Sequence, residues 1–380
     1  MDFELTADQK LLVDTVASFA KRESPPSRLR KLREDAIGYS RDTWKQMAEL
    51  GWLGVMFPES MGGYGGGFLD VALILEQLGT TLVPEPIIPS LVLVGTALRD
   101  SGDSKAIERW LPPLIAGEVT YAFAYAEEGA RYNPLYCNTR AEKRDGGWLL
   151  RGKKAFVLNG HAADEILVVA RTSGEVDSRE GLALFMVPKG AVNLGIKPIR
   201  LIDGHRAAVL SFEGVEVSDA QKLEVADVAS LIELVIDHGA AAACAEGVGV
   251  MRASLDLTAD YLRTRTQFGV KIGSFQALQH RAVDMFVEVE LSKSTSIYAA
   301  IKVSDPDPIE RASAISASKA QLGVSGRYVT QQAIQLHGGI GITDEHDIGL
   351  YFKRMQSLNT LFGDEEHHVQ RFASSPTFAG

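Results

Sequence analysis

The sequence predicts a mixed α+β fold with an N-terminal helical domain at residues 1–119, a middle β domain at 120–225 and a C-terminal helical bundle at 226–380. Three observations support this order. Apolar residues recur at helical spacing in the first part, short strand-like segments follow one another in the middle, and long helical stretches return at the end. A chain of 380 residues is long enough to form two or three domains.

The first part is expected to be helical throughout. Thr6 and Gln9 have the spacing of a capping box, and apolar residues follow them at helical intervals. Further helices are expected at 42–50 and 69–78. The glycine-rich stretch 58–65 lies between these two helices. A dinucleotide fingerprint needs a preceding strand and a βαβ unit, which the sequence does not show here, so we interpret the stretch as a turn.

The middle part is expected to form strands. Asp145-Gly146 is a favourable hairpin turn, because both residues tolerate the left-handed backbone that tight hairpins need. Strands that follow one another without helices between them indicate an antiparallel barrel or sandwich. The segments rich in strand-forming residues are 139–144, 148–151, 165–171, 182–187 and 208–212.

The last part is expected to form a four-helix bundle. Its long helical segments are 228–263, 275–303, 308–336 and 347–359.

Composition narrows the class of protein. Hydrophobic residues make up 46% of the chain and charged residues 23%, which are ordinary values for a globular protein. The net charge of −10 argues against nucleic acid as the main partner, because phosphate binding draws on clustered Lys and Arg. The basic residues at 28–33 are interpreted as a solvated helix face.

Cysteine usage and hydropathy indicate a soluble cytoplasmic protein. Cys137 and Cys244 are the only cysteines, too few for a disulfide framework and without the spacing of metal ligands. The N-terminus shows no secretory signal, and no uninterrupted apolar run reaches the roughly eighteen residues of a membrane span. We therefore expect no membrane association and no metal.

Two motifs in the C-terminal part suggest a dinucleotide site. The first is Arg265-Thr266-Gln267-Phe268-Gly269, which continues to Phe275-Gln276, and the second is Gln335-Leu336-His337-Gly338-Gly339. A guanidinium suits a pyrophosphate because its planar fork makes two charge-assisted hydrogen bonds. Paired glycines let a backbone approach a phosphate or ribose closely, although glycines after a helix more often serve only as its cap.

Together, these motifs resemble the acyl-CoA dehydrogenase flavoproteins, and the resemblance covers essentially the whole chain. In detail, the sequence is most similar to the small subunit of bacterial pimeloyl-CoA dehydrogenases. The resemblance implies FAD-dependent α,β-dehydrogenation of an acyl-CoA thioester in a dimer or tetramer, with electron-transfer flavoprotein or a similar protein as acceptor. It also implies FAD contacts across a subunit boundary by Arg265, Phe268, Phe275, Gln276, Gln335, Gly338 and Gly339.

The side expected to face the flavin ring and the substrate departs from the family pattern. Residues 126–133 stand where the family usually has Thr-Glu-Pro-Gly-Ala-Gly-Ser-Asp. Glu127 matches the family's Glu, but the threonine, proline, second glycine and serine are replaced, which puts an arginine and a tyrosine in this segment. Phe156 and Leu158 stand where the family has Trp and Thr. Leu158 therefore has no hydroxyl to donate to the flavin.

The catalytic base is not assigned by the sequence. Aligned from the glycine motif, the family's usual Glu falls on Phe362 with Gly363 after it, whereas aligned from the C-terminal end it falls on Asp364. Asp364 is therefore a possible base, but it is equally suited to begin a helix, where the dipole favours acids. The position that some family members use on an earlier helix is occupied here by Gly239.

Three hypotheses follow. The chain is the small subunit of a heteromeric acyl-CoA dehydrogenase that completes a larger partner's FAD site, or a self-sufficient homo-oligomeric enzyme that uses Asp364 as base. The third is a non-catalytic CoA-binding or structural homologue. A retained dinucleotide motif beside an altered ring pocket favours the first.

Overall fold

The computed structural model describes residues 5–376, and over this range the chain divides into two compact units. We call them the helical unit, from residues 1–31, 68–83 and 240–380, and the β unit, from 32–67 and 84–239. The helix α7 (Val228–Thr264) contributes its first residues to the β unit and the rest to the helical unit.

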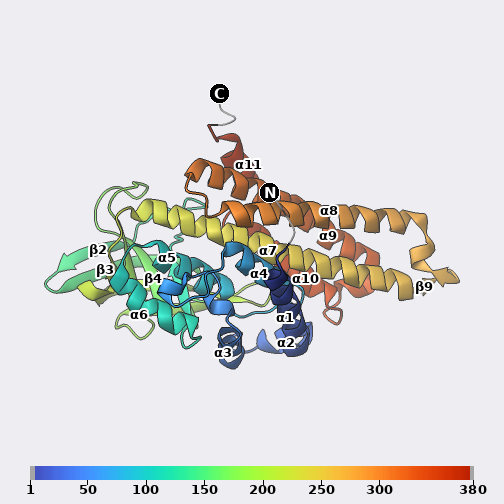
Figure 1. The fold of residues 1–380 in the computed structure, drawn as a ribbon, viewed down its shortest axis with the longest axis horizontal. Coiled ribbons are helices and arrows are strands. Elements are labelled where there is room, and N and C mark those ends of the chain that lie inside the picture. The colour runs from blue at the N-terminus through green and yellow to red at the C-terminus, as the bar shows by residue number, and fades with distance from the viewer. Residues whose placement is uncertain (1–4, 377–380) are drawn as a thin grey trace. The chain divides into compact units, whose positions relative to one another are not determined.

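The helical unit is built on long helices. α8 and α9 run along each other, and α10 and α11 also pack on α9 (Figure 1). Besides its part of α7, the unit contains α1 (Ala7–Glu23), α2 (Pro26–Leu32), α4 (Phe68–Gly79), α8 (Gln276–Lys302), α9 (Pro308–His337), α10 (Ile348–Thr360) and α11 (Glu365–Ala373).

These helices confirm the predicted C-terminal bundle to within about two residues at each end, and α11 begins at the possible helix start that the sequence suggested at Asp364. The capping box at the start of α1 is also confirmed, because the Thr6 hydroxyl accepts from the Gln9 amide and the Gln9 side chain accepts from the Thr6 amide.

The described part of the β unit contains an eight-stranded sheet in the order β6-β7-β3-β2-β4-β5-β8, with β1 paired to β4. The predicted Asp145-Gly146 hairpin is confirmed, since Arg144 pairs with Gly147 across it. The strands are β1 (Tyr121–Ala124), β2 (Arg140–Arg144), β3 (Gly147–Leu158), β4 (Glu165–Arg171), β5 (Leu182–Pro188), β6 (Leu194–Arg200), β7 (Arg206–Ser218) and β8 (Lys222–Leu223).

The described sheet is antiparallel, as expected, except at β4. Both β1 and β2 pair with β4 in parallel, while the other described pairings in this sheet are antiparallel. The physical reason lies in β4 itself, which is buried on both faces from Ile166 to Arg171. A continuous apolar run of this kind is typical of parallel strands, and β1 is equally buried.

The β unit also has a buried apolar core and several short helices. Its core includes Leu150, Ile166, Phe185, Leu210 and Val215, all with 0% exposure. The helices of this unit include α3 (Arg41–Glu49), a π-helix (Ile87–Val94), α5 (Gly95–Asp100) and α6 (Ser104–Ile115).

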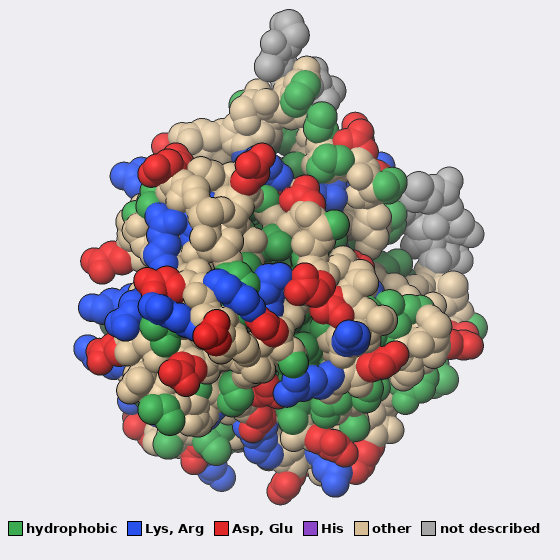
Figure 2. Space-filling model, turned by 90° about the vertical axis from the view of Figure 1, so that its left-hand side faces the viewer, with side chains coloured by type: hydrophobic (Ala, Val, Ile, Leu, Met, Phe, Trp, Pro, Cys, Tyr) green, Lys and Arg blue, Asp and Glu red, His purple; other side chains and the backbone are tan. Residues whose placement is uncertain are grey.

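By length and composition alone, α7 could cross a membrane, since an 18-residue window of it has a mean hydropathy of 1.5. However, 72% of that window is buried inside the structure, as in the core helix of a soluble protein. On the face of the molecule shown in Figure 2, acidic and basic side chains are interspersed and do not gather by sign.

Candidate dinucleotide-binding site

The Arg265 motif forms a rigid hairpin directly after α7. Strands β9 (Thr266–Gln267) and β10 (Val270–Lys271) pair antiparallel around the turn Phe268-Gly269. Both turn residues are left-handed, with φ of +52° and +79°, as a tight two-residue hairpin requires. The Arg265 amide donates to the Tyr261 carbonyl at 2.8 Å and its carbonyl accepts from Ile272 at 2.9 Å. The base of the hairpin is therefore fixed by backbone bonds.

The side chains of this hairpin are presented to the outside. The Arg265 side chain is exposed, and within residues 5–376 its guanidinium has no hydrogen bond or ion pair. The Phe268 ring is 89% exposed and touches Phe275 edge-on, with ring centroids 6.3 Å apart. Gln276, the first residue of α8, is also exposed. A free guanidinium on a fixed backbone is suited to an anionic ligand.

The glycine motif forms an open turn after α9. Gly338 has φ +63° and ψ −140°, a conformation that residues with a Cβ avoid, and its amide caps the helix by donating to the Gln335 carbonyl. A Cβ added to Gly338 or Gly339 would meet no atom within 4 Å. Capping therefore explains Gly338, whereas nothing in the described chain requires glycine at 339. The free space fits a ligand that approaches the backbone.

An aromatic stack joins the two motifs. The Tyr261 ring lies 4.6 Å from that of His337, which lies 4.5 Å from that of His346. His337 is buried, and its Nδ1 donates to the Ala333 carbonyl at 2.7 Å. Burial lowers the pKa of His337, which favours the neutral ring. Because Tyr261 precedes the hairpin and His337 precedes the glycine turn, the structure brings together the two motifs that the sequence suggested.

The carboxylate of Glu127 is bonded to neighbouring residues and holds its own segment in place. Its carboxylate lies 2.7 Å from the Lys154 ammonium and accepts from the amides of Asn138 and Thr139 at 2.7 and 3.0 Å. Burial by itself would raise the pKa of Glu127, but the charge and hydrogen bond of Lys154, with the Thr139 bonds, hold the pKa below its usual value. Its part in a flavin or substrate pocket would be to shape the loop, a role that stays a prediction.

Sequence reading missed Arg171, at the end of β4, which has 0% exposure. Its guanidinium donates to five backbone carbonyls at distances of 2.7 to 3.2 Å, which belong to Leu135, Cys137, Val176, Ser178 and Glu180. The segments around 135–137 and 176–180 are therefore joined through one side chain. The only sequence signal was a charge ending an apolar strand.

Phe156 projects from an irregularity in β3. Its φ is +53°, it lies at a register shift between Lys154 and Val157, and its side chain is 42% exposed. This bulge gives Phe156 an outward ring at the position where the family has Trp. Leu158, at the end of the same strand, is half-buried and contributes no hydrogen-bond donor from its side chain.

The positions proposed for the catalytic base do not present a free carboxylate. Phe362 is only 7% exposed and left-handed, with φ +60°, and Gly363 follows with φ +113°. Asp364 is the N-cap of α11, where its side chain accepts from the His367 amide at 2.9 Å. Asp364 therefore has the geometry of a residue that begins a helix, which was one of the two interpretations of its sequence position. At the earlier position, Gly239 is buried within α7.

His368 holds the Phe362-Gly363 turn. His368 Nε2 donates to the Phe362 carbonyl at 3.0 Å, and its Nδ1 lies 3.3 Å from the Ser316 hydroxyl. Burial, with the nearby Lys319 charge, lowers the pKa of His368 to about 2, so the ring is neutral. A Cβ on Gly363 would lie 2.5 Å from this ring, which explains the glycine.

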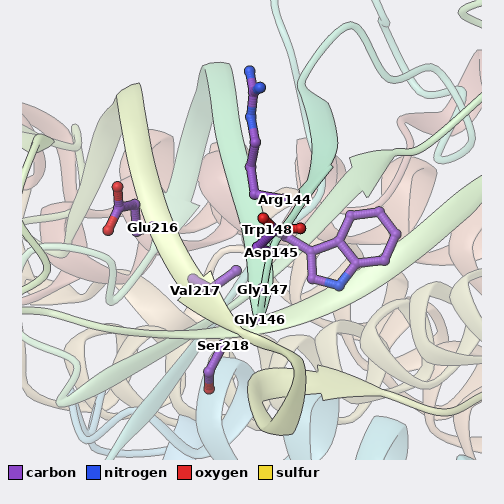
Figure 3. A pocket seen from close by; sticks show the side chains of 8 residues that line it. All are labelled: Arg144, Asp145, Gly146, Gly147, Trp148, Glu216, Val217 and Ser218. Atoms are coloured by element: carbon purple, nitrogen blue, oxygen red, sulfur yellow. The ribbon is translucent and has the colours of Figure 1, made fainter.

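Two surface hollows are each lined by residues of one unit only. One of about 570 Å³ is bordered by Arg327, Asn359, Asp364 and Glu365, among others. The other, of about 320 Å³, lies at the tip of the β2–β3 hairpin, where Arg144 and Trp148 extend from the strand end and Glu216 projects from β7 (Figure 3). The residues predicted for the site are absent from the lining of the second hollow.

Comparison with known families agrees with this architecture over nearly the whole chain. The N-terminal domain of acyl-CoA dehydrogenases matches residues 6–118, the middle domain matches 122–215 and the C-terminal domain matches 229–375. The chain thus belongs to the acyl-CoA dehydrogenase family, whose members are FAD-binding oxidoreductases that act on the CH–CH bond of acyl-CoA thioesters.

Individual relatives align with this chain over most of the length of both proteins. The chain is 31% identical to acyl-CoA dehydrogenase IpdE2 of Mycolicibacterium smegmatis, over 97% of this chain and 98% of that protein. It is 28% identical to FadE12 of Mycobacterium tuberculosis, over 90% and 88%. The ChsE4–ChsE5 complex from Mycobacterium tuberculosis is similar in structure, with a TM-score of 0.87, 26% identity and 98% of each chain covered. Butyryl-CoA dehydrogenase from Megasphaera elsdenii shares the fold, with a TM-score of 0.90, 24% identity and coverage of 98% and 99%.

Proposed function

We propose that this chain is the small subunit of a heteromeric FAD-dependent acyl-CoA dehydrogenase. In this proposal it completes the FAD site of a larger partner subunit through the hairpin at 265–276 and the glycine turn at 335–339. The observation that carries the proposal is the Arg265 guanidinium, which is exposed and unpaired within the described chain while its backbone is fixed. A side chain held in this way is suited to a ligand from outside the chain.

Each element has a defined task in this proposal. Arg265 binds the pyrophosphate of FAD through its planar fork. Gly339 lets the backbone approach the adenosine half, and Phe268 packs against the partner beside it. Bound FAD supplies the acceptor for the hydride that leaves the β-carbon of the substrate. The residues of this chain bind and orient the nucleotide half.

The proposal assigns proton abstraction to the partner. A base must lie next to the α-carbon with its carboxylate free, because geometry precedes any matching of pKa. Phe362 is apolar and buried, and the Asp364 carboxylate is bonded to the His367 amide. The side chain of Leu158 likewise offers no hydrogen bond to a flavin ring. A similar known structure, ChsE4–ChsE5, is a complex of two differently named proteins, which also supports a heteromer.

The decisive experiment compares flavin content with and without the partner. We expect the chain purified alone to be colourless and the complex co-expressed with a larger acyl-CoA dehydrogenase subunit to be yellow and active. In the complex, Arg265→Ala is expected to weaken FAD binding by about tenfold or more, as the loss of a charge-assisted hydrogen bond predicts.

Arg263→Ala is the matched control. Arg263 is also exposed, but it pairs with Asp260 at 2.8 Å on the same helix, so its removal should leave FAD content unchanged. A chain that is yellow and active alone would instead support the self-sufficient enzyme. Full FAD retention by Arg265→Ala would refute the cofactor assignment. If the chain neither binds flavin nor alters a partner, it is a non-catalytic homologue.

We also propose a substrate class, a location and an electron acceptor. The likeness to a complex described as a steroid ACAD, with 25% identity, and the resemblance to the pimeloyl type support a ring-derived or dicarboxylyl acyl-CoA. We also propose a cytoplasmic location and electron-transfer flavoprotein or a similar protein as acceptor. Turnover of the complex with a panel of such thioesters tests the substrate class.

A further inference from the structure

Arg30 is not part of a solvated helix face, so the sequence interpretation of residues 28–33 was wrong at this position. Its side chain is only 20% exposed and contacts the loop that follows the glycine turn. The Arg30 guanidinium donates to the Asp347 carboxylate at 2.9 and 3.2 Å. It also donates to the carbonyls of Asp344 and Glu345. One side chain of α2 therefore fixes both the carboxylate and the backbone of residues 344–347.

The clamped loop carries a ring of the aromatic stack. His346 lies between the residues that Arg30 holds, and its Nδ1 accepts from the Ile348 amide at 3.2 Å. Its ring lies 4.5 Å from His337, and His337 lies 4.6 Å from Tyr261. Arg30 thus holds the backbone that carries His346, and ring contacts continue from His346 through His337 to Tyr261.

Two members of this series, His337 and Tyr261, adjoin the dinucleotide elements. His337 is the last residue of α9, directly before Gly338. The Tyr261 carbonyl accepts the Arg265 amide at 2.8 Å. A shift of the loop at 344–347 would therefore alter the relative position of the guanidinium and the glycine turn. Affinity for a ligand that spans both depends on their being held in place before binding.

We propose that Arg30 is a positioning residue that, through the Tyr261–His337–His346 stack, holds the Arg265 hairpin and the Gly338-Gly339 turn in register for the nucleotide half of FAD. This inference rests on the proposed function. Arg30 does not touch FAD; it acts through the loop that it clamps.

The test measures the FAD dissociation constant by titrating FAD into the deflavinated complex. We expect Arg30→Ala to weaken FAD binding by about fivefold or more while the KM for acyl-CoA stays the same, because only the nucleotide site loses its preorganisation. Lys31→Ala is the matched control, since Lys31 lies next to Arg30 in α2, is exposed and carries the same charge. Arg30→Lys should recover little, because an ammonium cannot reproduce the forked contacts.

A second variant keeps the test decisive if Arg30→Ala does not fold. His346→Asn removes the ring but retains a side-chain oxygen that can accept from the Ile348 amide, and it should also weaken FAD binding. The inference is overturned if both variants bind FAD within about twofold of the unaltered complex while Arg265→Ala weakens binding. If Arg265→Ala itself has no effect, the proposed function fails instead.

Discussion

The buried ion pair between α7 and α10 gives a quantitative test of the helical unit. Glu246 and Arg354 form a forked contact, with Arg354 Nε 2.6 Å from Oε1 and Nη2 2.8 Å from Oε2. Their side chains are 8% and 9% exposed. Glu246→Ala would leave a buried guanidinium without its counter-charge, which costs about 3–5 kcal/mol of the free energy of unfolding.

This loss should be large enough to measure by thermal unfolding. For a unit of about 150–250 residues, each kcal/mol shifts the melting temperature by roughly 2–4 °C, so we expect a decrease on the order of 6–20 °C. The assay is circular dichroism of the assembled protein at a fixed concentration. Asp260→Ala is the control, because Asp260 pairs with Arg263 at 2.8 Å but both side chains are more than 70% exposed. Its effect should stay below about 2 °C, as for other surface ion pairs.

Replacing both residues of the pair tests the cause of the lost stability. It distinguishes the cost of burying a charge without its counter-charge from the loss of the attraction between the two charges. Glu246→Leu combined with Arg354→Met removes both charges and should recover most of the stability lost by Glu246→Ala. If Glu246→Ala melts within about 2 °C of the unaltered protein, the pair is not buried as described and the reasoning is refuted.

Three further predictions concern single positions. Gly339→Ala should leave the melting temperature unchanged, because its Cβ meets no atom within 4 Å, yet weaken FAD binding in a titration; unaltered binding would remove Gly339 from the site. Asp364→Asn should keep both the helix cap and near-normal turnover of the complex, whereas loss of turnover with intact folding would identify Asp364 as the base. Burial lowers the pKa of Lys319 to about 8, so the unfolded chain binds more protons than the folded one between about pH 8 and 10.5. The free energy of unfolding should therefore rise with pH across that window, and Lys319→Met should abolish this contribution in denaturant titrations.

Local patterns made much of the fold predictable. The capping box of Thr6 and Gln9, the Asp145-Gly146 turn and the long helical periods depend on neighbouring residues alone, and the structure confirms them. The parallel partners of β4 were missed, and of α11 only the start at Asp364 was suggested. The pairing of strands depends on contacts between residues distant in sequence, and α11 is a short helix of 9 mostly polar residues.

The candidate site was predictable only as separate motifs. Arg265 and Gly338 were proposed because their motifs resemble those of a known family, and their role stays a prediction; the structure shows an exposed guanidinium and an open turn at these positions. The stack that joins them could not be foreseen, because Tyr261, His337 and His346 have no mutual signal in sequence. The same holds for Arg30, whose acceptors are more than three hundred residues away.

The way Arg171 is bound has a consequence for the evolution of the loops around it. The acceptors recorded for its guanidinium are main-chain oxygens, and every amino acid provides one. Substitutions at positions such as 135, 176 or 178 therefore leave these bonds available as long as the path of the chain is kept. A loop anchored in this manner is free to diverge in side-chain chemistry while its shape is inherited.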